Sequence, residues 1–545
     1  MKSVTNTVKK LNKTAVIVAV VHFFVSFLTD RLIFDYVLLD FSTTKQMLRT
    51  IETAGVKLAF LLFVILLWQG VFWAAKHADR TFLKVAGGYM LLMTVLLLLT
   101  WPGIWRMDEF GILSSSVQLY PHFWQNYITT VFYVLALMLL PFPAGVIIVQ
   151  CVCVSLVVAR LVTLGLNDSL KTERKLQSAV KRAVLILPFL MLPVLDSNLY
   201  PIRMSLYAFL EVLLIAELFF LAKKQGNSEV AEKDCRYYWC YITLLAAVVT
   251  LWRTEAVYYF VAYPVLLLLV GRGRKYVKYM ILYFIIAVIL FVPQKIGERL
   301  TSGQQYELTS IVLPLVPLVE AADENADPQD QKLLAVMDQV VNVEVTLEGA
   351  AEGKSGINLF WGEPGFQREY TPEQFAEFKS AFYQLALKYP GVFLKERWET
   401  FTESSDLLEN TTDLFTRDGV PNYETFKNYP ISNPINNEIR TDVIKRLELR
   451  DVHDYNVKLA MTDYVYSAIP AIIVLAVTAV CLLLRRRWIT LVLVLTVLVK
   501  VPLIFLTAPS RLFMYYYSVY LFGYCVLFYI IYQLCIRFRG EEPVV

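Results

Sequence analysis

The chain has 545 residues, of which 57% are hydrophobic and only 18% are charged, and its mean hydropathy is +0.52. Soluble domains carry about 25% charged residues. This composition, with many apolar runs of membrane-spanning length, excludes soluble, disordered and fibrous proteins and predicts an α-helical polytopic membrane protein. The 51 Lys and Arg against 47 Asp and Glu give a net charge of +4, which is too balanced for a nucleic-acid-binding protein.

About twelve transmembrane helices are predicted, because roughly 20 apolar residues cross a bilayer. The basic residues before the first run, and the lack of a small-residue cleavage site after it, indicate a retained helix rather than a signal peptide. The apolar runs are 14–34, 55–75, 84–103, 143–165, 183–196, 204–222, 237–252, 256–271, 279–293, 464–484, 488–507 and 513–535.

Clusters of Lys and Arg in the loops after alternate spans predict the orientation, since such loops are typically cytoplasmic. The pattern places both termini in the cytoplasm. It requires that the apolar stretch 122–140, bounded by Pro121 and Pro141, lie along the outer interface, where its aromatic residues suit the headgroup layer. The alternative is a plain transmembrane helix with one other span misassigned. The basic loops are 76–84, 171–182, 223–236, 272–278, 485–487 and 537–539.

One long segment, 294–463, has the opposite charge to the rest of the chain. It holds 29 acidic and 16 basic residues, a net charge of −13, and none of the seven Cys. We therefore expect an extracytoplasmic, α-rich domain that folds without disulfides, which favours a bacterial plasma membrane. Thr371, Pro372 and Gln374 predict the start of a helix with a capping box, and Tyr389-Pro390-Gly391 its end. The predicted regions are 1–83 (two spans), 84–293 (a membrane core with the outer loop 104–142), 294–463 and 464–545 (three spans).

Motifs typical of soluble enzymes are absent from the sequence, which has only four His, so no metal site and no cofactor is predicted from motifs. A divalent metal remains an open alternative. Polar and ionisable residues gather instead at the outer ends of spans, where they are candidates for function. Four such clusters occur, at 101–110, 196–203, 252–255 and 508–517.

Three Arg residues in these clusters suit one chemical task. A guanidinium holds phosphate through two hydrogen bonds and stays charged. Arg203, Arg253 and Arg511 are therefore candidates for binding the phosphate of a lipid whose tail remains in the bilayer. An acid close to that phosphate, in 101–110, could act as a general base on an incoming hydroxyl.

The sequence resembles the GT-C superfamily of polytopic glycosyltransferases, which take sugars from polyprenyl-phosphate carriers. The resemblance covers about 84–295 and rests on the Trp101-Pro102-Gly103 turn, the acid in the first large outer loop, the interfacial helix, and the Arg-x-Glu at 253–255. The segments Tyr389–Lys395 and Ala508–Tyr515 also look like parts of uncharacterised Gram-positive members. No Asp-x-Asp occurs in the first outer loop, and the soluble domain precedes the last three spans rather than following them.

By this resemblance, Asp108 takes a proton from the acceptor while the acceptor oxygen attacks the anomeric carbon, with inversion, and Glu109 is the alternative base. Arg253, with Arg203 or Arg511, would stabilise the leaving phosphate, and Glu255 would orient Arg253. The implied partners are a polyprenyl-phosphate-linked sugar donor, a cell-envelope acceptor (a cell-wall polymer, polysaccharide or glycolipid) and the lipid bilayer. The sugar and any protein partner stay unidentified.

Two other functions stay open at this point. A polysaccharide polymerase or ligase would also handle lipid-linked sugars, and would be favoured by a pyrophosphate-linked oligosaccharide donor. A lipid or sugar transporter, which is not an enzyme, would be expected to carry repeats and polar residues near the middle of the bilayer.

Overall fold

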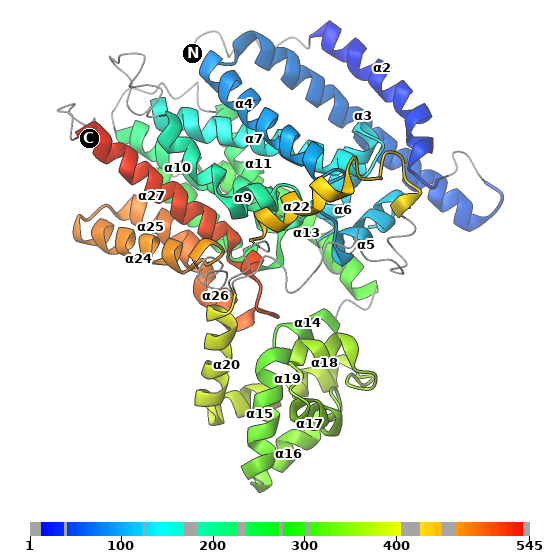
Figure 1. Ribbon diagram of the computed structural model, residues 1–545, viewed down its shortest axis with the longest axis vertical. Coiled ribbons are helices and arrows are strands. Elements are labelled where there is room, and N and C mark those ends of the chain that lie inside the picture. The colour runs from blue at the N-terminus through cyan, green and yellow to red at the C-terminus, as the bar shows by residue number, and fades with distance from the viewer. Residues whose placement is uncertain are drawn as a thin grey trace. The chain divides into compact units, whose positions relative to one another are not determined.

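The computed structural model describes residues 12–36, 41–121, 123, 126–167, 182–226, 236–271, 276–300, 305–325, 327–404, 426–449 and 464–537. These residues are helical almost throughout, and the part of the chain described contains no strand beyond one isolated bridge between Val341 and Gln367. Nine helical segments within it are long and apolar enough to cross a membrane. The protein is therefore an α-helical membrane protein (Figure 1).

The nine long segments agree with nine of the predicted spans, and two more predicted spans form shorter apolar helices, α11 (Arg236–Trp252) and α24 (Ile469–Leu484). The predicted span 183–196 is not one continuous helix. It consists of a helical piece at 182–186, the 3₁₀ turn η2 (Leu187–Leu190) and α9 (Leu192–Ser197). Pro188 and Pro193 account for the breaks, because proline lacks the N–H that a continuing helix requires.

The chain forms two compact units. The first comprises Met1–Gln294, Asn410–Leu498 and Tyr517–Val545, and the second comprises Lys295–Glu409 and Val499–Tyr516. The acidic segment 294–463 is thus divided between the units. Its later part belongs to the first unit because α22 (Asn437–Leu447) packs against α4 (Arg80–Leu99) and α9.

The first unit begins with a pair of helices, α2 (Lys13–Thr29) and α3 (Thr44–His77), joined through the 3₁₀ turn η1 (Asp30–Leu32). A buried ion pair connects them: Lys57 Nζ lies 2.6 Å from Asp30 Oδ2 and also donates to Ser26 Oγ at 2.5 Å. The rings of Phe23, Phe27 and Phe60 surround the same ammonium at 4.3 to 5.5 Å. Three aromatic faces and a carboxylate therefore compensate this charge for the loss of water.

The centre of the first unit is α10 (Arg203–Gly226), most of whose apolar stretch is buried. It contacts α7 (Ala144–Asn167), α11, α12 (Tyr259–Gly271), α25 (Trp488–Leu498) and α27 (Tyr517–Arg537), as Figure 1 shows in part. α24 packs on α25 and α27, and α4 packs on α7. α13 (Val277–Leu300) follows α12 and ends the first long stretch of the unit.

Two short helices lie between α4 and α7: α5 (Met107–Val117) and α6 (Tyr127–Leu139). α6 has 13 residues, begins at the Asn126 cap and packs against α5. Its limits lie inside the predicted stretch 122–140. Its position along the outer interface stays a prediction.

The second unit is a small bundle with an aliphatic and aromatic core. The predicted capping box is confirmed: the backbone N–H of Thr371 donates to Gln374 Oε1 at 2.8 Å, and that of Gln374 to Thr371 Oγ1 at 3.3 Å. The predicted break at Tyr389-Pro390 is also confirmed, since one helix ends at Lys388 and the next begins at Pro390. The helices are α14 (Gln305–Thr309), α15 (Val312–Asn325), α16 (Pro328–Met337), α17 (Val343–Ala351), α18 (Gly356–Gly362), α19 (Pro372–Lys388), α20 (Pro390–Thr402) and α26 (Lys500–Thr507), with the 3₁₀ turn η6 (Phe513–Tyr515).

Candidate functional site

The turn that precedes the predicted catalytic acids requires glycine. Gly103 has a φ of +96°, and a Cβ there would lie 2.1 Å from Ile147 Cδ1 and 3.0 Å from the carbonyl oxygen of Leu199. Its N–H donates to the carbonyl of Thr100 at 2.9 Å, and the next N–H, of Ile104, donates to Leu199 at 3.0 Å. The chain therefore leaves α4 in a fixed direction, against the segment that leads into α10.

A buried arginine from α22 holds the same turn. Arg440 Nε donates to the carbonyl of Thr100 at 3.2 Å and its Nη2 to that of Gly103 at 2.8 Å. Trp101 Nε1 donates to the carbonyl of Ile431 at 3.0 Å. The carbonyl oxygens of a surface loop usually accept hydrogen bonds from water. Here side chains more than 300 residues away in the sequence donate to them, and these hydrogen bonds hold the turn in one conformation.

Arg106, directly before α5, is part of a buried ion-pair network. Its Nη2 lies 2.8 Å from Glu448 Oε1 and 2.5 Å from the hydroxyl of Tyr200, which itself donates to Glu448. All three side chains are almost fully buried. This network fixes the residue at which α5 begins, and so the orientation of the first turn that follows.

Asp108 and Glu109 occupy that first turn of α5. The free N–H groups of a helix N-terminus favour negative charge. The two side chains nevertheless differ in environment, since Asp108 is exposed to solvent and Glu109 is 2% exposed. Within the described part of the chain, Glu109 Oε2 has no hydrogen-bond partner. A buried carboxylate oxygen without a partner is costly when charged, which favours the protonated form of Glu109.

The surroundings of this pair favour protonation. Burial, and then the negative charge of Asp108, raise the pKa of Glu109 to about 7, although Arg106 and Arg203 pull it down. Desolvation by the surrounding protein also raises the pKa of Asp108, while the charge of Arg203 lowers it. Negative charge on Asp108 disfavours ionisation of Glu109, so these surroundings keep Glu109 partly protonated near neutral pH.

The structure brings Arg203 into this site. It is the first residue of α10, and its charge acts on both Asp108 and Glu109. The predicted cluster at 252–255 lies beside it in the fold, because Trp252 Nε1 donates to the carbonyl of Arg203 at 3.0 Å.

Arg253 is buried and forms an ion pair with Glu255, a contact that both an orienting acid and a purely structural pairing would make. It precedes the 3₁₀ turn η3 (Thr254–Tyr258), which leads into α12. The hydroxyls of Tyr258 and Tyr259, just beyond, donate to Glu211 of α10 at 3.2 and 2.8 Å. These contacts fix the segment that carries Arg253 on α10, the helix that begins with Arg203.

The third predicted phosphate ligand has different surroundings. Arg511 belongs to the second unit and lies among three carboxylates: it contacts Glu403, lies 3.4 Å from Glu396 and lies 4.0 Å from Glu399. The negative charge of these three carboxylates exceeds the single positive charge of Arg511. Arg203 and Arg253 are therefore better candidates for a phosphate ligand than Arg511, whose charge is already paired within the second unit.

Sequence reasoning missed several residues that shape this site. Arg106 lies two positions before Asp108, and a basic residue at the N-cap of a helix that starts with two acids was the available signal. Tyr200, Arg440 and Glu448 gave no such signal, because their partners are distant in sequence. Within the described residues, no group of three or more His, Cys, Asp or Glu is placed to hold a metal ion.

Comparisons with family models, with curated proteins and with solved structures gave no match.

Proposed function

We propose that the protein is a membrane glycosyltransferase that moves a sugar from a polyprenyl-phosphate carrier to an extracytoplasmic acceptor. The observation that carries this proposal is the acidic pair at the start of α5. A solvent-exposed carboxyl and a buried one, with a pKa of about 7 for Glu109, stand in the field of Arg203. This combination supplies both a base for an attacking hydroxyl and fixed positive charge for a leaving phosphate.

In the proposed reaction, Asp108 receives the proton of the acceptor hydroxyl, because its carboxylate is the one that solvent and substrate can reach. The acceptor oxygen forms a bond to the anomeric carbon, and the bond from that carbon to the carrier phosphate breaks with inversion. The electron pair of the broken bond leaves on the phosphate. Arg203 and Arg253 stabilise the charge that develops there, where it lowers the barrier most.

Glu109 controls the charge of its neighbour. While Glu109 holds a proton, Asp108 can ionise without a second negative charge beside it. A protonated Glu109 thus leaves the carboxylate of Asp108 available as the general base.

The experiment measures the release of a radiolabelled sugar from its polyprenyl-phosphate carrier, in membranes that contain the protein. A panel of radiolabelled hexose, pentose and N-acetylhexosamine donors covers the unidentified sugar. Asp108→Asn keeps the volume and removes the base, so we expect transfer to fall about 100-fold to 10,000-fold. Full activity in Asp108→Asn with loss in Glu109→Gln would transfer the role to Glu109, and full activity in both variants would refute the proposal.

A transporter of lipid-linked sugars is the second candidate, favoured by ion pairs within the apolar helices that have at least one buried member. Besides the Lys57–Asp30 pair, Arg160 Nε lies 2.7 Å from Glu217 Oε1 and its Nη2 lies 3.1 Å from Oε2. Such residues within membranes often mark transport pathways. Proteoliposomes distinguish the functions: a transporter would move a labelled donor across the bilayer without cleaving it, and Asp108→Asn would leave that movement intact.

A further inference from the structure

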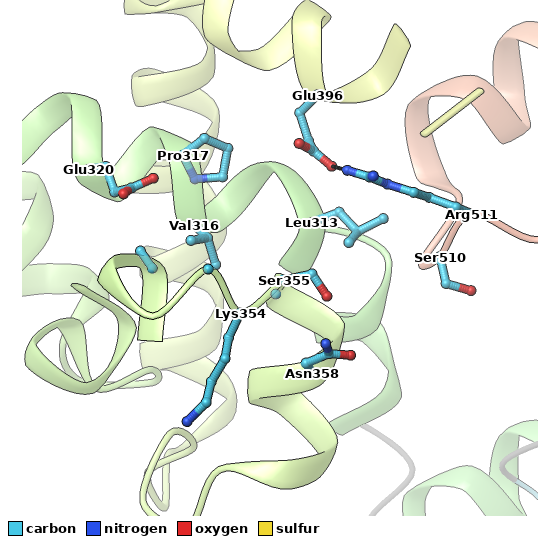
Figure 2. A pocket seen from close by; sticks show the side chains of 13 residues that line it. Leu313, Val316, Pro317, Glu320, Lys354, Ser355, Asn358, Glu396, Ser510 and Arg511 are labelled. Carbon is cyan, nitrogen blue, oxygen red and sulfur yellow. Dashed lines mark hydrogen bonds and ion pairs between the residues drawn. The ribbon is translucent and has the colours of Figure 1, made fainter. Parts of the chain in front are cut away.

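A cavity of about 430 Å³ opens in the second unit (Figure 2). Its volume falls within the roughly 300 to 1,000 Å³ typical of small-molecule sites. Its walls come from α15, from the turn between α17 and α18, from α20 and from the segment that contains Ser510 and Arg511. Every one of these elements belongs to the second unit, so the cavity is complete within it.

The turn that forms one wall is closely packed. A Cβ at Gly356 would lie 1.9 Å from the carbonyl oxygen of Val312, so only glycine allows the turn to approach α15 at this distance. The residues on either side, including Ser355 and Asn358, are therefore held in place by backbone packing. A site fixed before binding loses little entropy when a ligand arrives.

Four polar side chains of the cavity are available to a ligand. In the described part of the chain, Glu320, Ser355, Asn358 and Ser510 make no side-chain hydrogen bond or ion pair with another residue. Ser355 stands at the N-cap of α18 without capping it. Together they present two hydroxyls, an amide and a carboxylate, which match the donors and acceptors of a polyhydroxylated molecule.

The cations of the cavity are already neutralised, which argues against an anionic ligand. Arg511 contacts Glu396 and Glu403, as Figure 2 shows for Glu396. Lys354 lies 2.6 Å from Glu363 and 2.8 Å from Glu352. An anion would have to displace these carboxylates and would meet their negative field. An apolar patch of Leu313, Val316 and Pro317 completes the lining and suits the C–H face of a sugar ring.

We infer that this cavity binds a neutral saccharide, and we assign it as the site for the acceptor glycan. The assignment as acceptor site rests on the proposed glycosyltransferase function, whereas saccharide binding itself does not. The full-length protein therefore has a second ligand site, built by different residues from those that act on the donor.

The test uses the purified full chain in detergent, carrying Asp108→Asn, which removes the proposed base, so that no transfer consumes the probe. The labelled protein is applied to an array of neutral oligosaccharides built from hexoses, pentoses, deoxyhexoses and N-acetylhexosamines, with uronate-, phosphate- and sulfate-bearing counterparts. We expect binding to at least one neutral class. Asn358→Ala, which removes the amide, and Ser355→Trp, which fills the cavity, should each weaken it tenfold or more.

Gln384→Trp provides the matched control, because Gln384 is exposed on α19 and lies outside the cavity. It should bind as the parent does. Binding to anionic glycans alone, binding that Ser355→Trp leaves unchanged, or no binding to any glycan would each overturn the inference. If the protein binds a neutral saccharide but transfers no sugar in the donor assay, the saccharide site stands and only the proposed glycosyltransferase function is refuted.

Discussion

Replacing Glu109 by Gln should change how the stability of the protein depends on pH. The pKa of this buried carboxyl is raised from an ordinary 4.5 to about 7, so the folded state holds its proton more tightly than the unfolded state. The stabilisation from that proton is complete below pH 4.5 and is lost as pH rises toward 7. The full loss is about 3 kcal/mol, because each pKa unit corresponds to about 1.4 kcal/mol.

Glutamine cannot ionise and therefore avoids this loss. Unfolding of the detergent-solubilised protein, followed by heat or denaturant at pH 5 and at pH 8, should show wild type losing more stability with rising pH than Glu109→Gln. The difference between the two proteins should amount to a few degrees in unfolding temperature at pH 8. Asp442→Asn is the control, since Asp442 is an exposed acid paired with Arg446 at 3.0 Å on α22.

A third variant tests the cause of the shift. The negative charge of Asp108 is the second-largest contribution that raises the pKa of Glu109. Asp108→Asn should therefore move the stability transition to lower pH without removing it. Parallel pH profiles for wild type, Asp108→Asn and Glu109→Gln would refute the argument that the two carboxyls interact in a desolvated site.

Further predictions concern other parts of the fold. Arg253→Lys should reduce transfer about 30-fold to 1,000-fold if Arg253 holds phosphate through two parallel bonds, whereas unchanged turnover with lowered thermal stability would show a purely structural pairing with Glu255. Gly103→Ala should cost about 2 kcal/mol in unfolding free energy, since the backbone at this position is in the left-handed region and space for a Cβ is lacking. Lys57→Leu should cost about 3 to 5 kcal/mol by leaving Asp30 buried and unpaired, and adding Asp30→Asn should recover much of this loss. Gln384→Cys in a Cys-free background should react with an impermeant thiol reagent in intact cells, and labelling only after lysis would invert the predicted topology.

Local patterns predicted much of the fold. Apolar runs gave nine long helices, and the residues at 371–374 gave a capping box, because each depends on neighbours within a few positions. Two features depend on distant partners and had no local pattern: Arg440 holds a turn some 340 residues away, and residues 499–516 complete the second unit.

The candidate site was predictable in composition but not in arrangement. Asp108 and Glu109 are adjacent in the sequence, yet successive residues on a helix point about 100° apart, so one is exposed and the other buried. The sequence therefore identified the acidic pair without showing which member ionises with difficulty. The surroundings of Arg511 were equally hidden, because its acidic partners lie more than 100 residues earlier.

The buried pair between α2 and α3 has a consequence for how the chain enters the membrane. A lone charged side chain at the centre of a helix costs about 2.5 to 3.5 kcal/mol to insert. Asp30 is made first, and its partner Lys57 follows 27 residues later on the next helix. Asp30 lies at the end of α2, whereas Lys57 lies inside α3, so α3 inserted alone would bring an uncompensated ammonium into the lipid. The hairpin of α2 and α3, rather than either helix by itself, is the unit that partitions into the bilayer.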